Sequence, residues 1–477
     1  MKQNILSKAG LFILLVAMLS SCSKWIDPDM NVNPDAPTVV PMDLLLPTVE
    51  ARLSYDIVQG NDGQRTLSLW IQHMTGTARQ SQSEGVYSFR AGDANNNWGS
   101  VYSGVLMDAK QLIEMAQQEK TKSTQFEAVG KILTAATLGY ASDLWGDIPF
   151  SEALQGADNL KPIFDSQQDI YTNIQSLLDD GIKLLKNPDA TDVFTLDGDI
   201  IFGGDTGKWI AAAYALKARY ALHLSKVDND AYTKALGFLE NAMKDAGGSA
   251  YYYYASGNNN NANPLFLFMQ DRGDIRVSDV MIDGLKATGD PRLAVYADTI
   301  TDTLTIGDDV YPPGSYVGAP AGVPLDGAST PGSGIASSDS KTPIITFTEV
   351  KFIEAECKAK TGDAAGAIAA LKEAVAASLN EYGVFDQDWF DTFSSDVDGL
   401  AGNDLYKRIM DEKWVALMYN FEAYNDWRRT GYPELTPNPA AGGKEIPRRF
   451  PYPTDPITYN PNTPQGVTIW DRIWWDK

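Results

Sequence analysis

Apolar side chains recur along much of this chain with the 3.6-residue period of an α-helix. In residues 124–145 they form one stripe, made of Phe126, Val129, Ile132, Leu133, Ala136, Tyr140 and Leu144. Such a stripe is typical of an amphipathic helix, and Gly146 and Pro149 would end it. The same period predicts further helices over residues 167–186, 206–225, 230–246, 346–361, 364–378 and 404–427.

Several of these predicted helices follow one another closely enough to pack as antiparallel pairs. Gly362 suits a helix C-terminus and Asp363 the start of the next helix, so a tight turn should join 346–361 to 364–378. Small residues there allow close approach, namely Ala355, Ala359, Ala367, Ala370 and Ala374. Pairing 124–145 with 167–186 and 206–225 with 230–246 completes an all-α, tetratricopeptide-like (TPR-like) helical repeat scaffold, although no pair carries the full TPR consensus.

Four segments lack helical periodicity and are predicted to be irregular. They are the Pro- and Asn-rich residues 24–48, residues 247–263, the Gly-, Pro- and Ser-rich residues 305–343, and the proline-rich C-terminal tail 432–477. Prolines at that density disfavour helix, so the tail should be extended over the surface. We therefore expect long loops and an extended tail on a helical scaffold, with function on the loops.

The N-terminus has the pattern of a targeting segment. Lys2 and Lys8 precede an uncharged, mostly apolar run over residues 9–19, which is too short for the roughly 20 residues that span a bilayer. Leu19-Ser20-Ser21-Cys22 resembles a bacterial lipobox. The pattern predicts a lipoprotein signal peptide over 1–21, lipidation at Cys22 and a single domain over 22–477; a plain signal peptide with an incidental cysteine is the alternative.

Composition excludes several classes of function. The chain has 39 Lys and Arg against 62 Asp and Glu, a net charge of −23, which disfavours nucleic acid as a partner. It would also disfavour polyanionic glycans, although local charge in a loop can oppose the net field. Only two histidines and two cysteines occur, so neither a multi-histidine metal site nor a disulfide framework is expected, and no cofactor is predicted.

Candidate catalytic residues are few. His73 and His223 both lie in segments with helical periodicity, where a structural role is the expected one. Asp143 and Asp147 could form the carboxylate pair of a glycosidase, but capping a helix end is the simpler interpretation. Two acidic groups could bind calcium, although neither matches an EF-hand: Asp197, Asp199 and Asp205, and Asp396, Asp398 and Asp404. The protein is not expected to be an enzyme.

Aromatic residues are abundant, with 11 Trp, 22 Tyr and 17 Phe. Rings on loops can stack against the C–H face of a sugar while nearby amides bond its hydroxyl groups. The candidate ligand-binding residues are therefore Tyr251, Tyr252, Tyr253, Tyr254, Asn258, Tyr311 and Tyr316. The alternative is that residues 251–254 form a short strand with alternate rings buried.

Several motifs together resemble the SusD/RagB family of Bacteroidetes surface lipoproteins, in its SusD-like second-type branch. After the lipobox come NVNPDAPTVVP (31–41), LWGDIPFSEAL (144–154), EKWVALMYNFEAYNDWRRTGYP (412–433) and IPRRFPYPTDPITYN (446–460). One departure is visible, because Thr454-Asp455-Pro456 stands where the family usually has a glutamate. This departure concerns a local cap or ion pair rather than the family assignment.

The resemblance implies a SusD-like fold that binds a nutrient and is not an enzyme. It implies an outer-membrane, lipid-anchored, surface-exposed position and a SusC-like TonB-dependent transporter as partner, with the binder lying over the barrel as a lid. Known ligands of the family are glycans, and other branches are associated with peptides. The framework tryptophans are expected to be core residues: Trp98, Trp145, Trp209, Trp414 and Trp427.

The sequence thus predicts a surface lipoprotein that binds an oligosaccharide, or a similar oligomeric nutrient, and delivers it to the transporter. Two alternatives remain at this stage. One is a TPR-type envelope scaffold without a small ligand, and the other is a polysaccharide-degrading enzyme. Deleting both long loops would leave a scaffold's role intact, whereas loss of turnover on a single Asp or Glu substitution would indicate an enzyme.

Overall fold

The computed structural model describes residues 40–60, 63–255, 257 and 261–477. The chain divides into residues 1–41 and one compact unit, 42–477, which contains all the elements discussed below. The predicted signal peptide and Cys22 lie outside the described residues, and so does Asn258. Among the described residues, no helix is both long and apolar enough to cross a bilayer.

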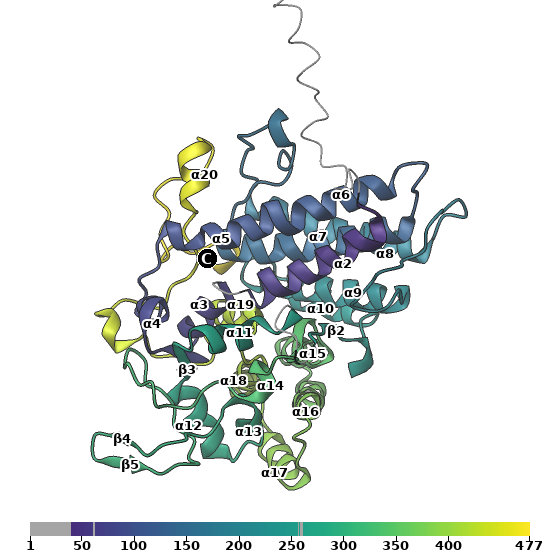
Figure 1. The fold of residues 1–477 in the computed structure, drawn as a ribbon. Coiled ribbons are helices and arrows are strands. Elements are labelled where there is room, and N and C mark those ends of the chain that lie inside the picture. Colours follow the sequence, from purple (N-terminus) through teal and green to yellow (C-terminus); the bar gives the residue numbers. More distant parts are fainter. Residues whose placement is uncertain (1–39, 61–62, 256, 258–260) are drawn as a thin grey trace, which may run out of the picture. The chain divides into compact units, whose positions relative to one another are not determined.

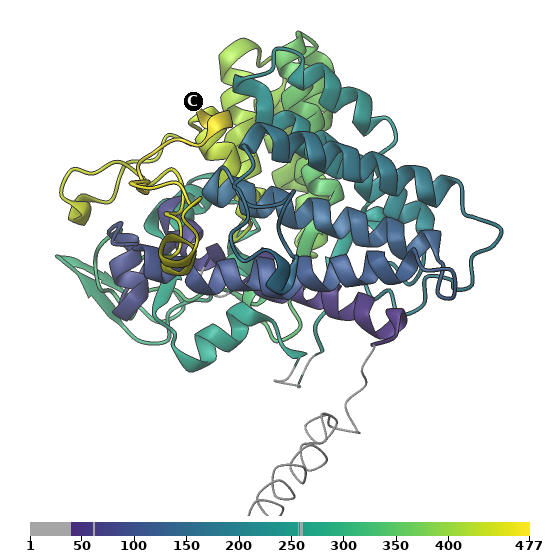
Figure 2. The same ribbon diagram turned by 90° about the horizontal axis from the view of Figure 1, so that it is seen from above.

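A series of helices, each packed on the next, forms the scaffold of this unit (Figures 1 and 2). The series consists of α6 (Met107–Ala116), α7 (Thr124–Trp145), α8 (Gln167–Lys186), α9 (Thr206–His223), α10 (Ala231–Leu239), α15 (Phe347–Thr361) and α16 (Ala364–Glu381). The predicted pairs are confirmed as α7 with α8, α9 with α10, and α15 with α16. The fold is therefore predominantly α-helical and TPR-like, as expected.

Short polar side chains begin these helices where the sequence places them. The Ser123 hydroxyl accepts a hydrogen bond from the Phe126 amide in α7, and Asp205 accepts one from the Lys208 amide in α9. At the α15–α16 turn, Gly362 has a φ of +91° and Asp363 caps α16 through the Gly366 amide. Each cap satisfies an N–H group that the first helical turn leaves unpaired, which stabilises the helix by about 1 kcal/mol.

The alanines at the α15–α16 interface are buried, so these two helices approach closely. Ala355, Ala367 and Ala374 are fully buried in a core that also takes in α17 (Gln387–Val397) and α18 (Gly402–Ala416). Cys357 is buried as a free thiol, and burial raises its pKa well above the ordinary value. Cys357 therefore acts as a small apolar residue of the core.

Residues 404–427 do not form the one helix that their periodicity predicts. α18 ends at Ala416, and α19 (Phe421–Thr430) begins after a break at residues 417–420. Tyr419 has a φ of +55°, and the Asn420 side chain caps α19 by accepting a hydrogen bond from the Glu422 amide. Because Leu417, Met418 and Tyr419 are all buried, the apolar pattern continues through the break and conceals it.

Three other boundaries differ from the predictions. The segment 24–48 was expected to be irregular, but α2 (Met42–Arg52) begins inside it, with Leu45, Leu46 and Val49 buried. α10 ends at Leu239 rather than near residue 246. The C-terminal tail contains one short α-helix, α20 (Thr454–Tyr459). This helix tolerates its one internal proline, Pro456, because Pro456 lies in the first turn, where the backbone needs no amide donor.

Outside the repeat, short elements surround three antiparallel two-stranded sheets. The sheets pair β1 (Met74–Gly76) with β3 (Ile275–Val277), β2 (Ala250–Tyr252) with β6 (Thr342–Ile345), and β4 (Leu304–Ile306) with β5 (Asp309–Tyr311). The remaining α-helices are α3 (Gly63–Trp70), α4 (Arg79–Gly85), α5 (Asn95–Gly99), α11 (Pro264–Asp271), α12 (Asp279–Thr288), α13 (Leu293–Tyr296) and α14 (Ser333–Ala336), and two π-helices are η2 (Leu53–Val58) and η4 (Ser100–Leu106). Short 3-10 helices are η3 (Ala91–Ala94), η5 (Gly156–Asp158), η6 (Leu224–Lys226), η7 (Ala246–Gly248), η9 (Pro439–Ala441) and η10 (Trp474–Asp476).

Candidate functional site

An aromatic groove lies where three segments meet, and we call it the Trp98 groove. It has a volume of about 380 Å³. α5 and η4 supply one side, the loop between α7 and α8 supplies another, and α20 with its flanks supplies the third. Its lining consists of Trp98, Tyr102, Ser103, Met107, Pro149, Ala153, Leu154, Leu160, Pro162, Phe164, Asp455, Pro456, Tyr459 and Asn460.

Aromatic rings dominate the groove. Trp98 lies nearly parallel to Phe164, with 6.1 Å between ring centroids and 23° between planes, and it is 4.6 Å from the Tyr102 ring. At the rim, Leu160 and Tyr459 expose 74% and 72% of their surface. Exposed apolar side chains gathered in one depression are typical of a binding surface.

Hydrogen bonds hold the α7–α8 loop in place on both sides of the groove. From η4, the Tyr102 hydroxyl donates to the Pro149 carbonyl at 2.8 Å. From α6, the Lys110 ammonium donates to the Leu154 carbonyl at 2.6 Å. From the tail, the Asn460 amide donates to the Pro162 carbonyl at 2.8 Å. The groove is thus shaped before any ligand arrives, so less conformational entropy is lost on binding.

The groove also has polar groups at its edge. The side chain of Asp455 and the hydroxyl of Tyr459 make no hydrogen bond with other described residues, and Ser103 bonds only to its own helix through the Gly99 carbonyl. Flat apolar rings with acceptors and donors at the rim suit a ligand that has one apolar face and many hydroxyl groups.

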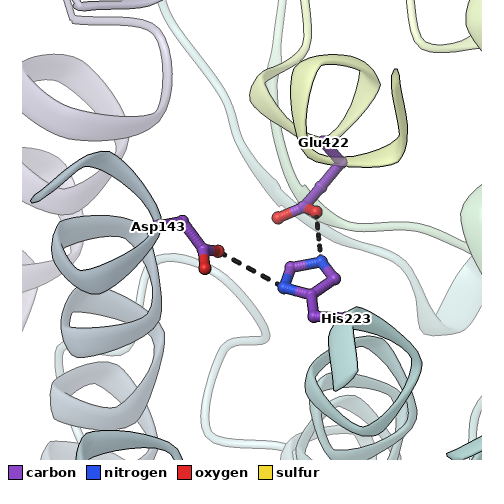
Figure 3. A group of neighbouring side chains, drawn as sticks. All are labelled: Asp143, His223 and Glu422. Atoms are coloured by element: carbon purple, nitrogen blue, oxygen red, sulfur yellow. Dashed lines mark hydrogen bonds and ion pairs between the residues drawn. The ribbon is translucent and has the colours of Figure 1, made fainter. Parts of the chain in front are cut away.

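A second candidate is the buried cluster of Asp143, His223 and Glu422, drawn in Figure 3. His223 ends α9 and lies between Asp143 of α7 and Glu422 of α19. Its Nδ1 is 3.3 Å from an Asp143 oxygen and its Nε2 is 2.9 Å from a Glu422 oxygen. Burial would lower the pKa of His223, but Glu422 and Asp143 raise it to about 9. The imidazole is therefore a cation that joins three helices.

This geometry does not suit a metal ion or a general base. The two ring nitrogens point to different carboxylates, and a protonated imidazole has no lone pair to offer. The Asp143 oxygens also accept hydrogen bonds from Tyr171, Trp475 and Asn425. The cluster lies in the protein interior and acts as a structural link between α7, α9 and α19.

The other acidic candidates are also bonded to groups of the chain. Asp147 caps the first turn of α8 through the Gln167 amide at 2.8 Å, not the end of α7. Asp199 accepts hydrogen bonds from three backbone amides and from Trp209 Nε1. Asp398 pairs with Lys372 at 2.7 Å. Among the described residues, neither predicted calcium group brings three carboxylates close enough to hold one ion.

Three of the four consecutive tyrosines predicted to bind ligand are buried. Tyr251 and Tyr252 belong to strand β2, and the Tyr254 hydroxyl is 2.9 Å from Thr342 Oγ1 in β6. Tyr251 lies under the Lys341 ammonium at 3.7 Å. Only Tyr253 of the four is exposed, at 61%. The segment thus begins as a short strand, but the adjacent Tyr251 and Tyr252 are both buried, so the rings do not alternate as the strand alternative expects, and one ring is left exposed.

The two remaining tyrosines lie in another part of the unit. Tyr311 ends β5 and Tyr316 follows it in the next loop, and both are half-buried. Tyr253 follows strand β2 in the β2–β6 sheet, whereas Tyr311 belongs to the separate β4–β5 sheet. No tyrosine proposed from the sequence lines the Trp98 groove.

The framework tryptophans are buried with one exception. Trp145, Trp209, Trp414 and Trp427 lie in the core as expected. Trp98 is only half-buried and lines the groove, so its prediction as a core residue is wrong. One feature of the sequence could have indicated the groove: the loop after Pro149 carries several apolar residues without helical or strand periodicity.

His73 does not lie in a helix as its sequence context indicates. It follows α3 in a turn, where the amide of Tyr419 donates to its Nδ1 at 3.2 Å, and its Nε2 is 3.0 Å from the Trp414 carbonyl. The proton is therefore on Nε2. Burial lowers the pKa of His73 to about 3, so this ring is neutral.

A model of a family described as starch-binding and associating with the outer membrane matches residues 34–453. The chain belongs to the SusD-like family. The resemblance seen in the sequence motifs is thereby confirmed over most of its length. A comparison with curated proteins finds none that matches this SusD-like chain.

Solved structures of SusD-like proteins share the fold. A SusD/RagB family protein from Bacteroides thetaiotaomicron is 23% identical, with a TM-score of 0.75, over 92% of this chain and 99% of that one. A chitin-binding SusD homologue from Flavobacterium johnsoniae is 22% identical, with a TM-score of 0.74, over 92% and 97%. At these identities the likeness establishes the fold, including its TPR-like helical part.

Proposed function

We propose that this SusD-like protein binds an oligosaccharide in the Trp98 groove and delivers it to a SusC-like TonB-dependent transporter. The observation that carries the proposal is the groove itself. Four aromatic rings and an exposed leucine at the rim line a depression whose walls are held by hydrogen bonds. Sugar rings stack on such surfaces through their C–H faces, and edge groups such as the Asp455 carboxylate and the Tyr459 hydroxyl can bond their hydroxyls.

Family membership supports the same proposal. The family is described as starch-binding and associating with the outer membrane, and a solved relative is described as chitin-binding. We propose that lipidation at Cys22 anchors the protein in the outer membrane with unit 42–477 at the cell surface. Binding without turnover is expected, because the Asp143–His223–Glu422 cluster is enclosed by bonded side chains.

The groove is tested by calorimetric titration with a panel of oligosaccharides that includes maltohexaose and chitohexaose. Tyr459→Ala should weaken binding of the glycan that the wild type selects by about tenfold, since stacking of one ring is worth about 1–1.5 kcal/mol. Tyr459 is largely exposed, so its removal should leave the fold intact.

Tyr253→Ala is the matched control, because it removes another exposed tyrosine outside the groove. Weakening by Tyr253→Ala and not by Tyr459→Ala would move the site to the β2–β6 sheet. If the wild type bound no glycan of the panel at millimolar concentration, the glycan proposal would fail and the envelope-scaffold alternative would gain support.

A further inference from the structure

A second depression lies between the segment after α4 and the C-terminal tail, and we call it the Trp470 pocket. Its volume is about 420 Å³. The segment after α4 forms one wall and the C-terminal tail forms the other. Its lining consists of Tyr87, Ser88, Phe89, Arg90, Ala91, Lys444, Pro451, Val467, Thr468, Ile469 and Trp470.

Trp470 presents an aromatic surface in this pocket. Its side chain is 37% exposed, and its ring meets the buried Tyr87 ring edge-on, with 6.2 Å between centroids. The backbone beneath it is held in a turn, because the Thr468 amide and hydroxyl both donate to Asp471 at 2.7 and 3.0 Å. The ring is therefore positioned by packing and a fixed turn while part of it stays accessible.

The charge of the pocket is opposite to that of the whole chain. Arg90 and Lys444 line it, and no acidic residue does, although the chain carries a net charge of −23. The Arg90 guanidinium has no ion-pair partner among the described residues. Lys444 makes one contact there, with the Trp470 ring, at 5.9 Å from the centroid.

The acidic residues nearby in sequence do not neutralise these two cations. Asp93 accepts the backbone amide of Arg90 at 2.8 Å, and Asp471 is bonded to Thr468. Glu445 follows Lys444 and is exposed, outside the lining. Two cations without acidic partners beside an accessible indole form a local positive field that an anion can use.

We infer that the Trp470 pocket binds a negatively charged sugar unit of the transported glycan. The sugar ring would stack on Trp470, and its anionic substituent, a carboxylate or a sulfate ester, would face Arg90 and Lys444. This inference rests on the proposed glycan-binding function and names its substrate class. The two depressions share no lining residue, but residues 90–98 and residues 451–460 each contribute to both.

The test is affinity electrophoresis in gels that contain defined polysaccharides. Homogalacturonan and glucuronoxylan supply carboxylates, carrageenan supplies sulfate esters, and carboxyl-reduced or desulfated forms are their neutral counterparts. We expect at least one anionic polymer to retard the wild type and its neutral form to retard it much less. Arg90→Ala/Lys444→Ala should raise the apparent dissociation constant at least tenfold, and Trp470→Ala should also raise it.

Lys183→Ala/Lys208→Ala is the control, because it removes the same charge from exposed positions on α8 and α9. Equal behaviour of the two double variants, or no retardation of the wild type by any anionic polymer, would overturn the inference. If neutral glycans still bound through the Trp98 groove, the proposed function would stand without it. If no glycan bound at all, both would fail. Retardation by carrageenan alone would identify a sulfate ester as the anion that the pocket binds. Retardation by the uronate polymers alone would identify a carboxylate.

Discussion

The two histidines of the chain differ in charge because their buried surroundings differ. His73 faces a backbone carbonyl and an amide and stays neutral, with a pKa lowered to about 3 by burial. His223 is equally buried but lies between two carboxylates, which raise its pKa to about 9. The sequence predicts a structural role for both histidines, and both positions fit it. Only His223, however, links separate helices through its charge.

His223 should make the stability of the protein fall at alkaline pH. Its folded pKa of about 9 lies above the ordinary 6.5, so its contribution is fully present below pH 6.5 and is lost as pH rises through 9. The free energy of unfolding should drop by up to about 3 kcal/mol across that range. Urea unfolding of the wild type and of His223→Gln between pH 6 and 9.5 measures this.

His223→Gln should be less stable at pH 6.5 and should lack this slope, because an amide cannot take up the proton. His73→Gln is the control: its ring is already neutral above pH 6, so the slope should remain. An identical slope in the wild type and in His223→Gln would show that the charge of His223 does not stabilise the fold.

Ion pairs within one helix could be predicted from residue spacing, whereas those between helices could not. Asp426 and Arg429 are three residues apart on α19, a spacing that favours an ion pair, and they form one at 2.7 Å. The partners of His223 lie 80 positions before it and 199 after it, and periodicity contains no information on such distances. Similarly, Arg429 also pairs with Glu356 of α15, which only the packed structure reveals.

Among the elements, the long helices could be predicted from the sequence, because each has one buried apolar face or begins at a recognisable capping residue. α8 shows this, with Ile170, Ile174 and Leu178 buried and Ser166 as its cap. The sequence predicts α18 and α19 as one helix, because the residues of the break between them are buried and apolar. α20 was missed because prolines surround it, although Pro456 sits where a helix tolerates proline.

The groove could not be predicted for a related reason. Its walls come from α5, the α7–α8 loop and α20, and about 360 residues of sequence separate the first of these from the last. The family motifs include both LWGDIPFSEAL and IPRRFPYPTDPITYN, but no pattern within either motif indicates that they meet. Tertiary hydrogen bonds, such as that from Asn460 to Pro162, bring them together.

These bonds allow α20 to be tested as a wall of the groove. In Asn460→Ala/Asn462→Ala, the hydrogen bonds to the Pro162 and Lys161 carbonyls are lost, at 2.8 and 2.9 Å. Glycan affinity should fall roughly tenfold, since two bonds of about 1 kcal/mol no longer hold the wall. Calorimetric titration gives the affinity, and hydrogen exchange over residues 454–462 shows whether the wall has loosened.

Thr458→Ala is the control for this prediction, because its hydroxyl bonds only within α20, to the Thr454 carbonyl at 2.7 Å. Its affinity should match that of the wild type. If the double variant loosened α20 yet bound the glycan unchanged, α20 would not belong to the binding site.

At the scale of the whole molecule, a TPR-like scaffold supports binding surfaces built from its connections. The helices of the repeat, α6 to α10 with α15 and α16, pack in series (Figure 2). The C-terminal tail contributes to both depressions, the α7–α8 loop contributes to the Trp98 groove, and the segment after α4 contributes to the Trp470 pocket. Rigid repeats suit this task because each connection is held at both ends. The acidic net charge disfavours anionic glycans at long range, whereas the Trp470 pocket provides a local exception.

We propose that this SusD-like protein is the binding half of a nutrient-uptake complex. Purification of the tagged protein from its own membranes in mild detergent, read by mass spectrometry, tests this most directly. An unrelated outer-membrane barrel, quantified in the same eluate, controls for shared micelles. We predict that a TonB-dependent barrel co-purifies well above that control, whereas no enriched barrel in several detergents would contradict the account and favour an envelope scaffold.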